Sequence, residues 1–321
     1  SLLSRLGTAP FLILNNGRKI PNLGLRTWLG VDKEGHPLAL KDLSMQHAVE
    51  NAIDAGYRLI VTAASYNTEI QVGTAIRNKI DEGVVRREDM FLVSKLWNNC
   101  HGKDAVLPAL KESLLKLGVE YLDLYLIHWP VGIRDDGTYD NTDYLETWQA
   151  MIEARARGLV KSIGVSNFNE HQLDRIITLT KTRPAILEIE LNLNLQQPSL
   201  VSFCRSHNIT VLAYTPLGSL VPARGLRDIP PPPPRVDSPK LVEIADKYHK
   251  TCVQIALRYL VDMGVVPLPN AMTTYHLWQN IDIFNFELTK VDRDFLKKYD
   301  KNYRVLSVPF WKDSQYYPFQ K

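Results

Sequence analysis

The chain has 321 residues, of which 45% are hydrophobic, and its formal net charge is only +3. We expect residues 1–321 to form a single domain, because this length is typical of one α/β barrel. The charge gives no reason to expect nucleic-acid binding, and no apolar run approaches the roughly 18 residues of a membrane helix. The cysteines, Cys100, Cys204 and Cys252, have neither metal-binding nor disulfide spacing, so we expect no metal site.

The N-terminal region predicts a β-hairpin. Apolar residues between positions 11 and 21 flank Asn16-Gly17, a pair typical of the type I′ turn, in which both residues have positive φ. After the hairpin, short apolar runs alternate with helical periodicity. The predicted strands are 23–28, 59–61, 90–94, 122–127, 160–165, 186–191, 210–213 and 265–267. The clearest predicted helices are 42–55, 103–117, 143–156 and 171–180.

Eight alternating units in one chain predict a closed parallel barrel, the α/β (β/α)8 TIM barrel, with an N-terminal β-hairpin. The alternative is an open doubly wound sheet, which has no support because no Gly-x-Gly-x-x-Gly follows a predicted strand. Five prolines at positions 230–234 predict an extended loop after the seventh strand. The aromatic-rich tail to Lys321 is expected to fold back over the barrel, so the barrel carries long C-terminal loops.

Polar side chains follow or end three neighbouring predicted strands. Tyr66 follows the second strand, Lys95 the third and His128 the fourth. Because the carboxyl ends of barrel strands meet at one rim, we expect these three side chains to converge on a catalytic site. A single histidine at such a position would be structural more often than not, and the agreement of three strands favours a site.

Several motifs together resemble the aldo–keto reductase superfamily, nearest to insect members that include 3-dehydroecdysone reductases. They are Ser-Lys95-Leu-Trp97-Asn, Leu-Ile-His128-Trp129-Pro, Ile-Gly-Val-Ser166-Asn167-Phe and Ala-Tyr214-Thr-Pro-Leu-Gly. In that family a tyrosine donates a proton to a carbonyl while a nicotinamide cofactor delivers hydride. A lysine paired with an aspartate assists the tyrosine, and a histidine orients the substrate oxygen. The resemblance assigns these roles to Tyr66, Lys95 and His128.

Val61 stands where the family has the aspartate that pairs with the lysine. We therefore expect Lys95 to lose its counter-ion and to assist Tyr66 poorly. Loss of one positioned acid–base partner costs about 10²–10⁴-fold in rate. This change alone would weaken an enzyme rather than abolish its activity.

The cofactor-binding positions are also changed. The resemblance assigns cofactor contacts to Thr27, Ser166, Asn167, Glu188, Tyr214 and Asn280, with Glu188 in place of a glutamine. Asn270, Ala271 and His276 stand where a lysine, a serine and an arginine are expected around the 2′-phosphate of NADPH. Arg26 replaces a glycine and either fills space that the dinucleotide uses or replaces the lost cations. We expect no tightly bound cofactor, with NADPH or NADH bound only weakly if at all.

These departures favour a non-catalytic protein that binds a small, carbohydrate or polycyclic ligand through Trp28, Trp97 and Trp129, unless these rings are packing residues only. The alternative is a weakened NAD(P)H-dependent reductase of carbonyl compounds or ecdysteroids. A hydrolase or lyase built on Tyr66, His128 and Glu188 is a third hypothesis.

We expect a monomer that binds neither nucleic acid nor membrane. The serine at position 1 and the sequon at Asn208 favour an extracellular location, with the cytoplasm as the alternative.

Overall fold

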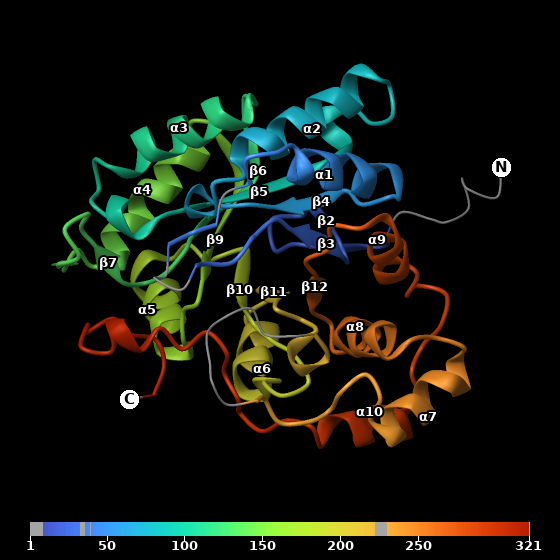
Figure 1. Ribbon diagram of the computed structural model, residues 1–321. Coiled ribbons are helices and arrows are strands. Elements are labelled where there is room, and N and C mark those ends of the chain that lie inside the picture. The colour runs from blue at the N-terminus through green and yellow to red at the C-terminus, as the bar shows by residue number, and fades with distance from the viewer. Residues whose placement is uncertain (1–8, 33–35, 39, 222–229, 321) are drawn as a thin grey trace.

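Eight parallel strands form the centre of the molecule in a computed structural model that describes residues 9–32, 36–38, 40–221 and 230–320 (Figure 1). In the order of their pairing they are β3 (Gly24–Arg26), β4 (Leu59–Val61), β5 (Phe91–Leu96), β6 (Leu122–Ile127), β9 (Val160–Ser166), β10 (Ile186–Glu190), β11 (Thr210–Tyr214) and β12 (Val266–Leu268). The backbone N–H of Arg26 donates to Pro269 O (3.1 Å), which links the two ends of this series. The predicted barrel is confirmed.

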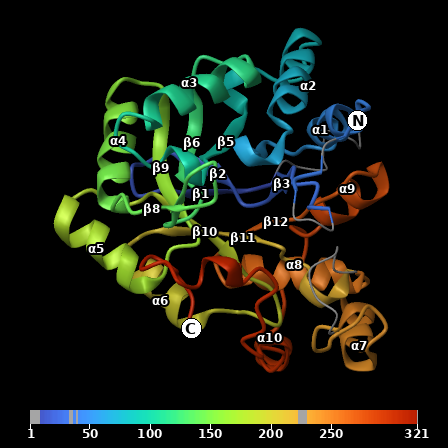
Figure 2. The same cartoon turned by 60° about the vertical axis from the view of Figure 1, so that its left-hand side comes forward.

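Helices surround the barrel, as Figures 1 and 2 show. They are α1 (Ser44–Asp54), α2 (Glu69–Asp81), α3 (Val106–Leu117), α4 (Tyr144–Ala156), α5 (Glu170–Thr180), α6 (Pro198–Ser206), α7 (Pro239–Tyr248), α8 (Cys252–Asp262), α9 (Thr274–Ile281) and α10 (Lys290–Lys297). Their apolar residues recur at helical spacing. For example, α1 buries Met45, Ala48, Val49, Ala52 and Ile53. Within the described residues, no helix has the length and apolar character needed to cross a membrane.

The N-terminal hairpin, β1 (Phe11–Ile13) and β2 (Lys19–Pro21), closes the amino-terminal end of the barrel. Leu14 and Ile20 pack into the apolar cluster that fills the barrel interior. The predicted type I′ turn is wrong. Leu14 pairs with Arg18 across a three-residue loop, in which Gly17 alone has positive φ (83°). Such a loop needs one left-handed residue, which glycine adopts without strain.

The tail beyond α10 returns across the carboxyl end of the barrel (Figure 2). The backbone N–H groups of Val305 and Leu306 donate to the carboxylate of Glu190, the last residue of β10, at 2.9 and 2.8 Å. Further along the tail, the ring of Trp311 lies 6.3 Å from that of Trp97 and 5.2 Å from that of Trp129. The prediction that the aromatic tail folds back over the barrel is confirmed.

Candidate active site

Tyr66, Lys95 and His128 meet at the carboxyl end of the barrel. Tyr66 ends the short 3-10 helix that follows β4, Lys95 lies near the end of β5, and His128 follows β6. Lys95 Nζ donates to Tyr66 Oη at 2.9 Å, and the rings of Tyr66 and His128 are 5.8 Å apart. The structure therefore brings together the three side chains that the strand ends predicted.

Lys95 has a counter-ion, contrary to our expectation. Val61 does lie in the apolar interior of the barrel and offers no charge. However, Glu188 on β10 reaches across the barrel and places Oε2 3.2 Å from Lys95 Nζ. The two side chains are 0% and 1% exposed, so this is a fully buried ion pair. Lys95 also donates to the backbone oxygen of Thr62 at 3.3 Å.

Arg26 joins the same network from β3. Its Nε donates to Tyr66 Oη at 3.2 Å, and its guanidinium lies 4.7 Å from the ring centres of both Trp28 and Tyr214. Burial by itself lowers the pKa of Arg26, but the nearby groups Tyr66 and Glu188 raise it above its ordinary value. Arg26 is therefore a charged member of the site.

His128 is a neutral imidazole in this environment. Burial lowers its pKa well below the usual range, and the positive charges of Lys95 and Arg26 lower it further. The ring packs edge-on against Trp97, with the ring centres 5.2 Å apart. A neutral imidazole can donate one hydrogen bond, for example to a substrate oxygen, without carrying charge into the site.

The predicted cofactor residues on β9, β10 and β11 form a connected group beside this network. Ser166 Oγ donates to Glu188 O (3.0 Å), and Asn167 Nδ2 donates to His128 O (3.0 Å). Tyr214 Oη donates to Asn167 Oδ1 at 2.6 Å. The second carboxylate oxygen of Glu188, Oε1, is buried and has no hydrogen-bond partner within the described residues. Such an atom can accept a donor from a ligand.

Thr27, which directly follows β3, lies nearby but faces other protein groups. Its hydroxyl donates to Val61 O at 3.0 Å and lies 3.0 Å from the hydroxyl of Thr68. Thr68 lies in turn 2.9 Å from the hydroxyl of Thr62. Thr27 therefore joins β3 to β4 in this structure.

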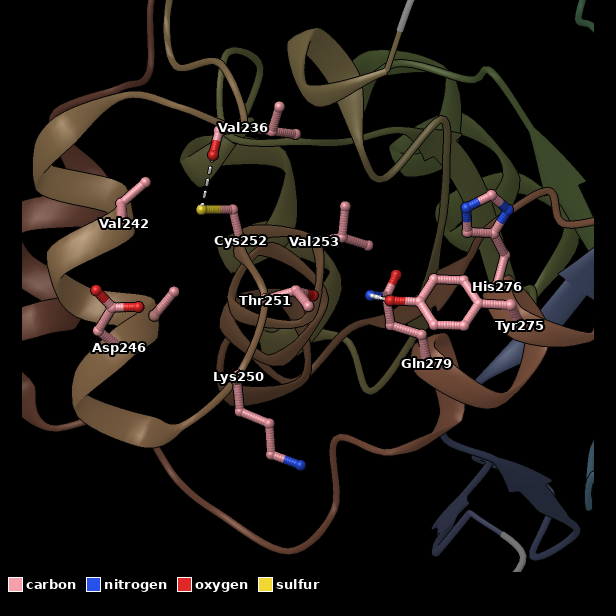
Figure 3. Close-up of a pocket in the computed structure, with 11 residues that line it drawn as sticks. Val236, Val242, Asp246, Lys250, Thr251, Cys252, Val253, Tyr275, His276 and Gln279 are labelled. Carbon is pink, nitrogen blue, oxygen red and sulfur yellow. Dashed lines mark hydrogen bonds between the residues drawn. The ribbon is translucent and has the colours of Figure 1, made fainter.

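The remaining predicted cofactor residues lie apart from the Tyr66 network, between β12 and the end of α9. Asn270 is exposed and donates to Trp28 O at 2.8 Å, Ala271 is buried in the core, and Asn280 is buried on α9. His276 lines a pocket of about 410 Å³ with Tyr275 and Gln279 (Figure 3). This volume lies within the range of about 300–1,000 Å³ that is typical of ligand sites.

Aromatic rings cover the site on the side of the tail. Trp97 packs on His128, whereas Trp129 is almost fully buried and lies edge-on to Trp311 and Phe319, with ring centres 5.2 and 6.0 Å away. Trp28 lies against Arg26. We did not assign Trp311 or Phe319 to the site from the sequence. The density of tail aromatics was the one signal that could have indicated them.

A parallel α/β barrel with a tyrosine, a lysine and a histidine at its carboxyl end belongs to the class of TIM barrels that carry acid–base side chains at the usual place of the active site. Residues 28–301 match the aldo/keto reductase family. The chain is 46% identical over 310 residues to the aldo-keto reductase AKR2E4 of Bombyx mori, covering 97% of this chain and 98% of that protein. It is 37% identical to human aldo-keto reductase family 1 member A1, covering 93% and 91%. The chain belongs to the aldo/keto reductase family.

Solved structures of this family superpose closely on the chain. The crystal structure of AKR2E4 in complex with NADP has a TM-score of 0.91 at 46% identity and covers 97% of this chain and 99% of its own. That of AKR2E5 complexed with NADPH has a TM-score of 0.93 at 40% identity, covering 98% and 94%. The expectation of a non-catalytic binding protein is therefore wrong, and so is the expectation that no cofactor is tightly bound. One of the physical grounds for the first expectation, an unpaired Lys95, is removed by Glu188.

Proposed function

We propose that this protein is a nicotinamide-dependent reductase of carbonyl compounds in which Tyr66 donates the proton. The observation that carries the proposal is the buried contact of Lys95 Nζ with Tyr66 Oη at 2.9 Å, with Glu188 3.2 Å behind the lysine. A hydroxyl beside a fixed, charge-balanced cation is suited to general acid catalysis, because the charge left on its oxygen is stabilised.

The unpaired Oε1 of Glu188 supports a nicotinamide cofactor, because the cofactor's carboxamide offers N–H donors to such an atom. Ser166, Asn167 and Tyr214 would hold the same end of the cofactor, while Asn280 and the pocket of Figure 3 would receive its other end. The relatives solved with NADP and NADPH support this assignment. When bound, the reduced cofactor supplies a hydride.

The substrate class follows from the groups around Tyr66. The neutral ring of His128 can donate a hydrogen bond to a carbonyl oxygen and orient it towards the tyrosine. The ring of Trp97 packs on that histidine, and its centre lies 6.3 Å from the ring centre of the tail residue Trp311, so apolar rings adjoin the site. These rings favour carbonyl compounds with a polycyclic body, among them the ecdysteroid ketones that the sequence resemblance suggests.

The test is oxidation of NADPH and of NADH in the presence of an aromatic aldehyde or a polycyclic ketone, with the wild type and Tyr66→Phe. We expect turnover by the wild type and a loss of about 10²–10⁴-fold in kcat for the variant, because the proton donor is removed. Tyr121→Phe, which changes a tyrosine before β6 at the opposite end of the barrel, is the matched control. A wild type without turnover on either cofactor would refute the proposal.

A further inference from the structure

Arg26 occupies a position in the site that packing alone does not explain. Its side chain is only 6% exposed, and it is the one described cation besides Lys95 that donates to the hydroxyl of Tyr66. Three rings surround the guanidinium, those of Trp28 and Tyr214 at 4.7 Å and that of Tyr66 at 5.6 Å. A planar guanidinium can stack on aromatic faces while its N–H groups bond in plane, so these contacts fix the direction of Nε.

The hydrogen bonds at Tyr66 Oη leave its proton available. The oxygen accepts from Lys95 Nζ at 2.9 Å and from Arg26 Nε at 3.2 Å, which uses both lone pairs. Within the described part of the chain, no group accepts the hydrogen of Tyr66 itself. The O–H bond is therefore free to point to a substrate oxygen.

The charges of the network favour the state that follows proton transfer. Lys95 and Arg26 are two cations, and among the described residues Glu188 is the single carboxylate in contact with Lys95, so these three buried side chains hold one excess positive charge. When Tyr66 gives up its proton, the negative charge on its oxygen neutralises that excess. Such preorganised charge lowers the barrier because it interacts most strongly with the charge that develops during the reaction.

We propose that Arg26 is a catalytic residue, which donates a hydrogen bond to the Tyr66 oxygen and stabilises the charge that forms there. In the step it assists, the O–H bond of Tyr66 breaks, an O–H bond forms on the substrate's carbonyl oxygen, and the carbonyl carbon accepts the hydride of the reduced nicotinamide cofactor. The ketone or aldehyde becomes an alcohol, and the cofactor is oxidised. This inference rests on the proposed function.

Two substitutions test the proposal. Arg26→Gly removes the side chain and leaves a space between Trp28 and Tyr214, whereas Arg26→Met removes the charge and fills much of that space. We expect kcat to fall about 10- to 100-fold in both variants, as for one lost hydrogen bond to a charged group, with KM for an aromatic aldehyde changed by less than about threefold. Ethylguanidinium added in solution should restore part of kcat in Arg26→Gly but not in Arg26→Met.

A second readout needs no turnover. Without cofactor or substrate, ethylguanidinium should bind Arg26→Gly saturably and change its tryptophan fluorescence, because the vacated space adjoins Trp28. Arg26→Met and the wild type should show no saturable change. If Arg26→Gly does not unfold cooperatively, Arg26→Met alone decides, and a kcat within about twofold of the wild type overturns the proposal.

Other outcomes also overturn the proposal. A rise in kcat for Arg26→Gly would mean that the guanidinium obstructs the site. Binding of ethylguanidinium without recovery of kcat would mean that Arg26 only packs. If the wild type turns over but the Arg26 variants match it, the inference fails alone. If the wild type shows no turnover, the proposed function and this inference fail together.

Discussion

The network around Tyr66 and the exposed segment that holds Asn270 and His276 both contain residues that we expected from the sequence to be departures from the family pattern, but their surroundings are opposite. Val61 and Lys95 are 0% exposed. There Glu188, 3.2 Å from the lysine, supplies the carboxylate that we expected from the sequence to be missing. Asn270 and His276 are exposed, and each makes a hydrogen bond with a nearby protein group.

This difference follows from desolvation. A buried ammonium without a partner costs several kcal/mol, so loss of a carboxylate from one strand is tolerated only if another strand supplies one. At the surface, water solvates the side chains that remain after a cation is lost, and exposed ion pairs contribute little to the free energy of unfolding. A change at a buried position therefore indicates lost function only when no other residue compensates for it.

The largest expected effect comes from breaking the buried pair with Glu188→Gln. The substitution keeps the shape of the side chain and removes its charge, so Lys95 is left unpaired. We expect kcat to fall about 10²–10⁴-fold and the free energy of unfolding to fall by about 3–5 kcal/mol. Steady-state assays and urea unfolding measure the two quantities.

The matched control for Glu188→Gln moves the carboxylate to β4 in the double variant Val61→Asp with Glu188→Gln. Position 61 directly precedes Thr62, whose backbone oxygen already contacts Lys95 at 3.3 Å. We expect this variant to regain at least about tenfold in kcat over Glu188→Gln. Wild-type activity in Glu188→Gln alone would show that Lys95 needs no counter-ion.

At the exposed positions Asn270 and His276 we expect a smaller effect, which is a gain in cofactor affinity without a loss of stability. The double variant Asn270→Lys with His276→Arg adds two cations at the positions that the family pattern assigns to the 2′-phosphate. The affinity for NADPH relative to NADH should rise about 10- to 100-fold, because only NADPH carries that phosphate. The free energy of unfolding should change by less than about 0.5 kcal/mol, as is usual at the surface.

Fluorescence titration with the two cofactors measures this preference. Asn270→Gln with His276→Gln is the control, since it changes the same positions without adding fixed charge. An equal gain for NADH and NADPH would show that these positions do not face the phosphate.

The fold could be predicted from the sequence because its strands are buried on both faces. Such strands are continuous apolar runs, and the predicted bounds of β4 and β6 agree with the structure. The turn of the hairpin was predicted wrongly, since Asn16-Gly17 is compatible with both a two-residue and a three-residue loop. Turn type depends on which residues pair across the hairpin, and that depends on how Leu14 and Ile20 pack into the barrel.

The site could be predicted only in part. Tyr66, Lys95 and His128 follow from the rule that strand ends converge. The pair of Lys95 with Glu188 does not, because β5 and β10 are separated by β6 and β9 in the sheet and their side chains meet across the interior. The direction of the Arg26 side chain likewise depends on the rings that surround it. Because each position was considered alone, we predicted that Lys95 had lost its counter-ion, whereas the fold supplies one from Glu188.

A buried histidine extends the comparison to the dependence of stability on pH. His101 lies between β5 and α3 and is fully buried. Burial lowers its pKa to about 4, although the negative charge of Asp140 raises the pKa by a smaller amount. In the unfolded chain a histidine takes up a proton near pH 6.5, but the folded protein does not until about pH 4. Between these values the unfolded state binds more protons, so stability is lost as the pH falls.

The expected slope is about 1.4 kcal/mol per pH unit for this one group. His101→Phe removes the titrating ring and keeps an aromatic side chain of similar size, so the slope that His101 causes should disappear. Urea unfolding of both proteins between about pH 7 and pH 5 measures the difference, which should grow in favour of the variant by about 2 kcal/mol from pH 6.5 to pH 5. Parallel curves of the free energy of unfolding against pH would mean that His101 is solvated or paired when it is charged. Burial would then not destabilise a charge at this position as it does at Lys95.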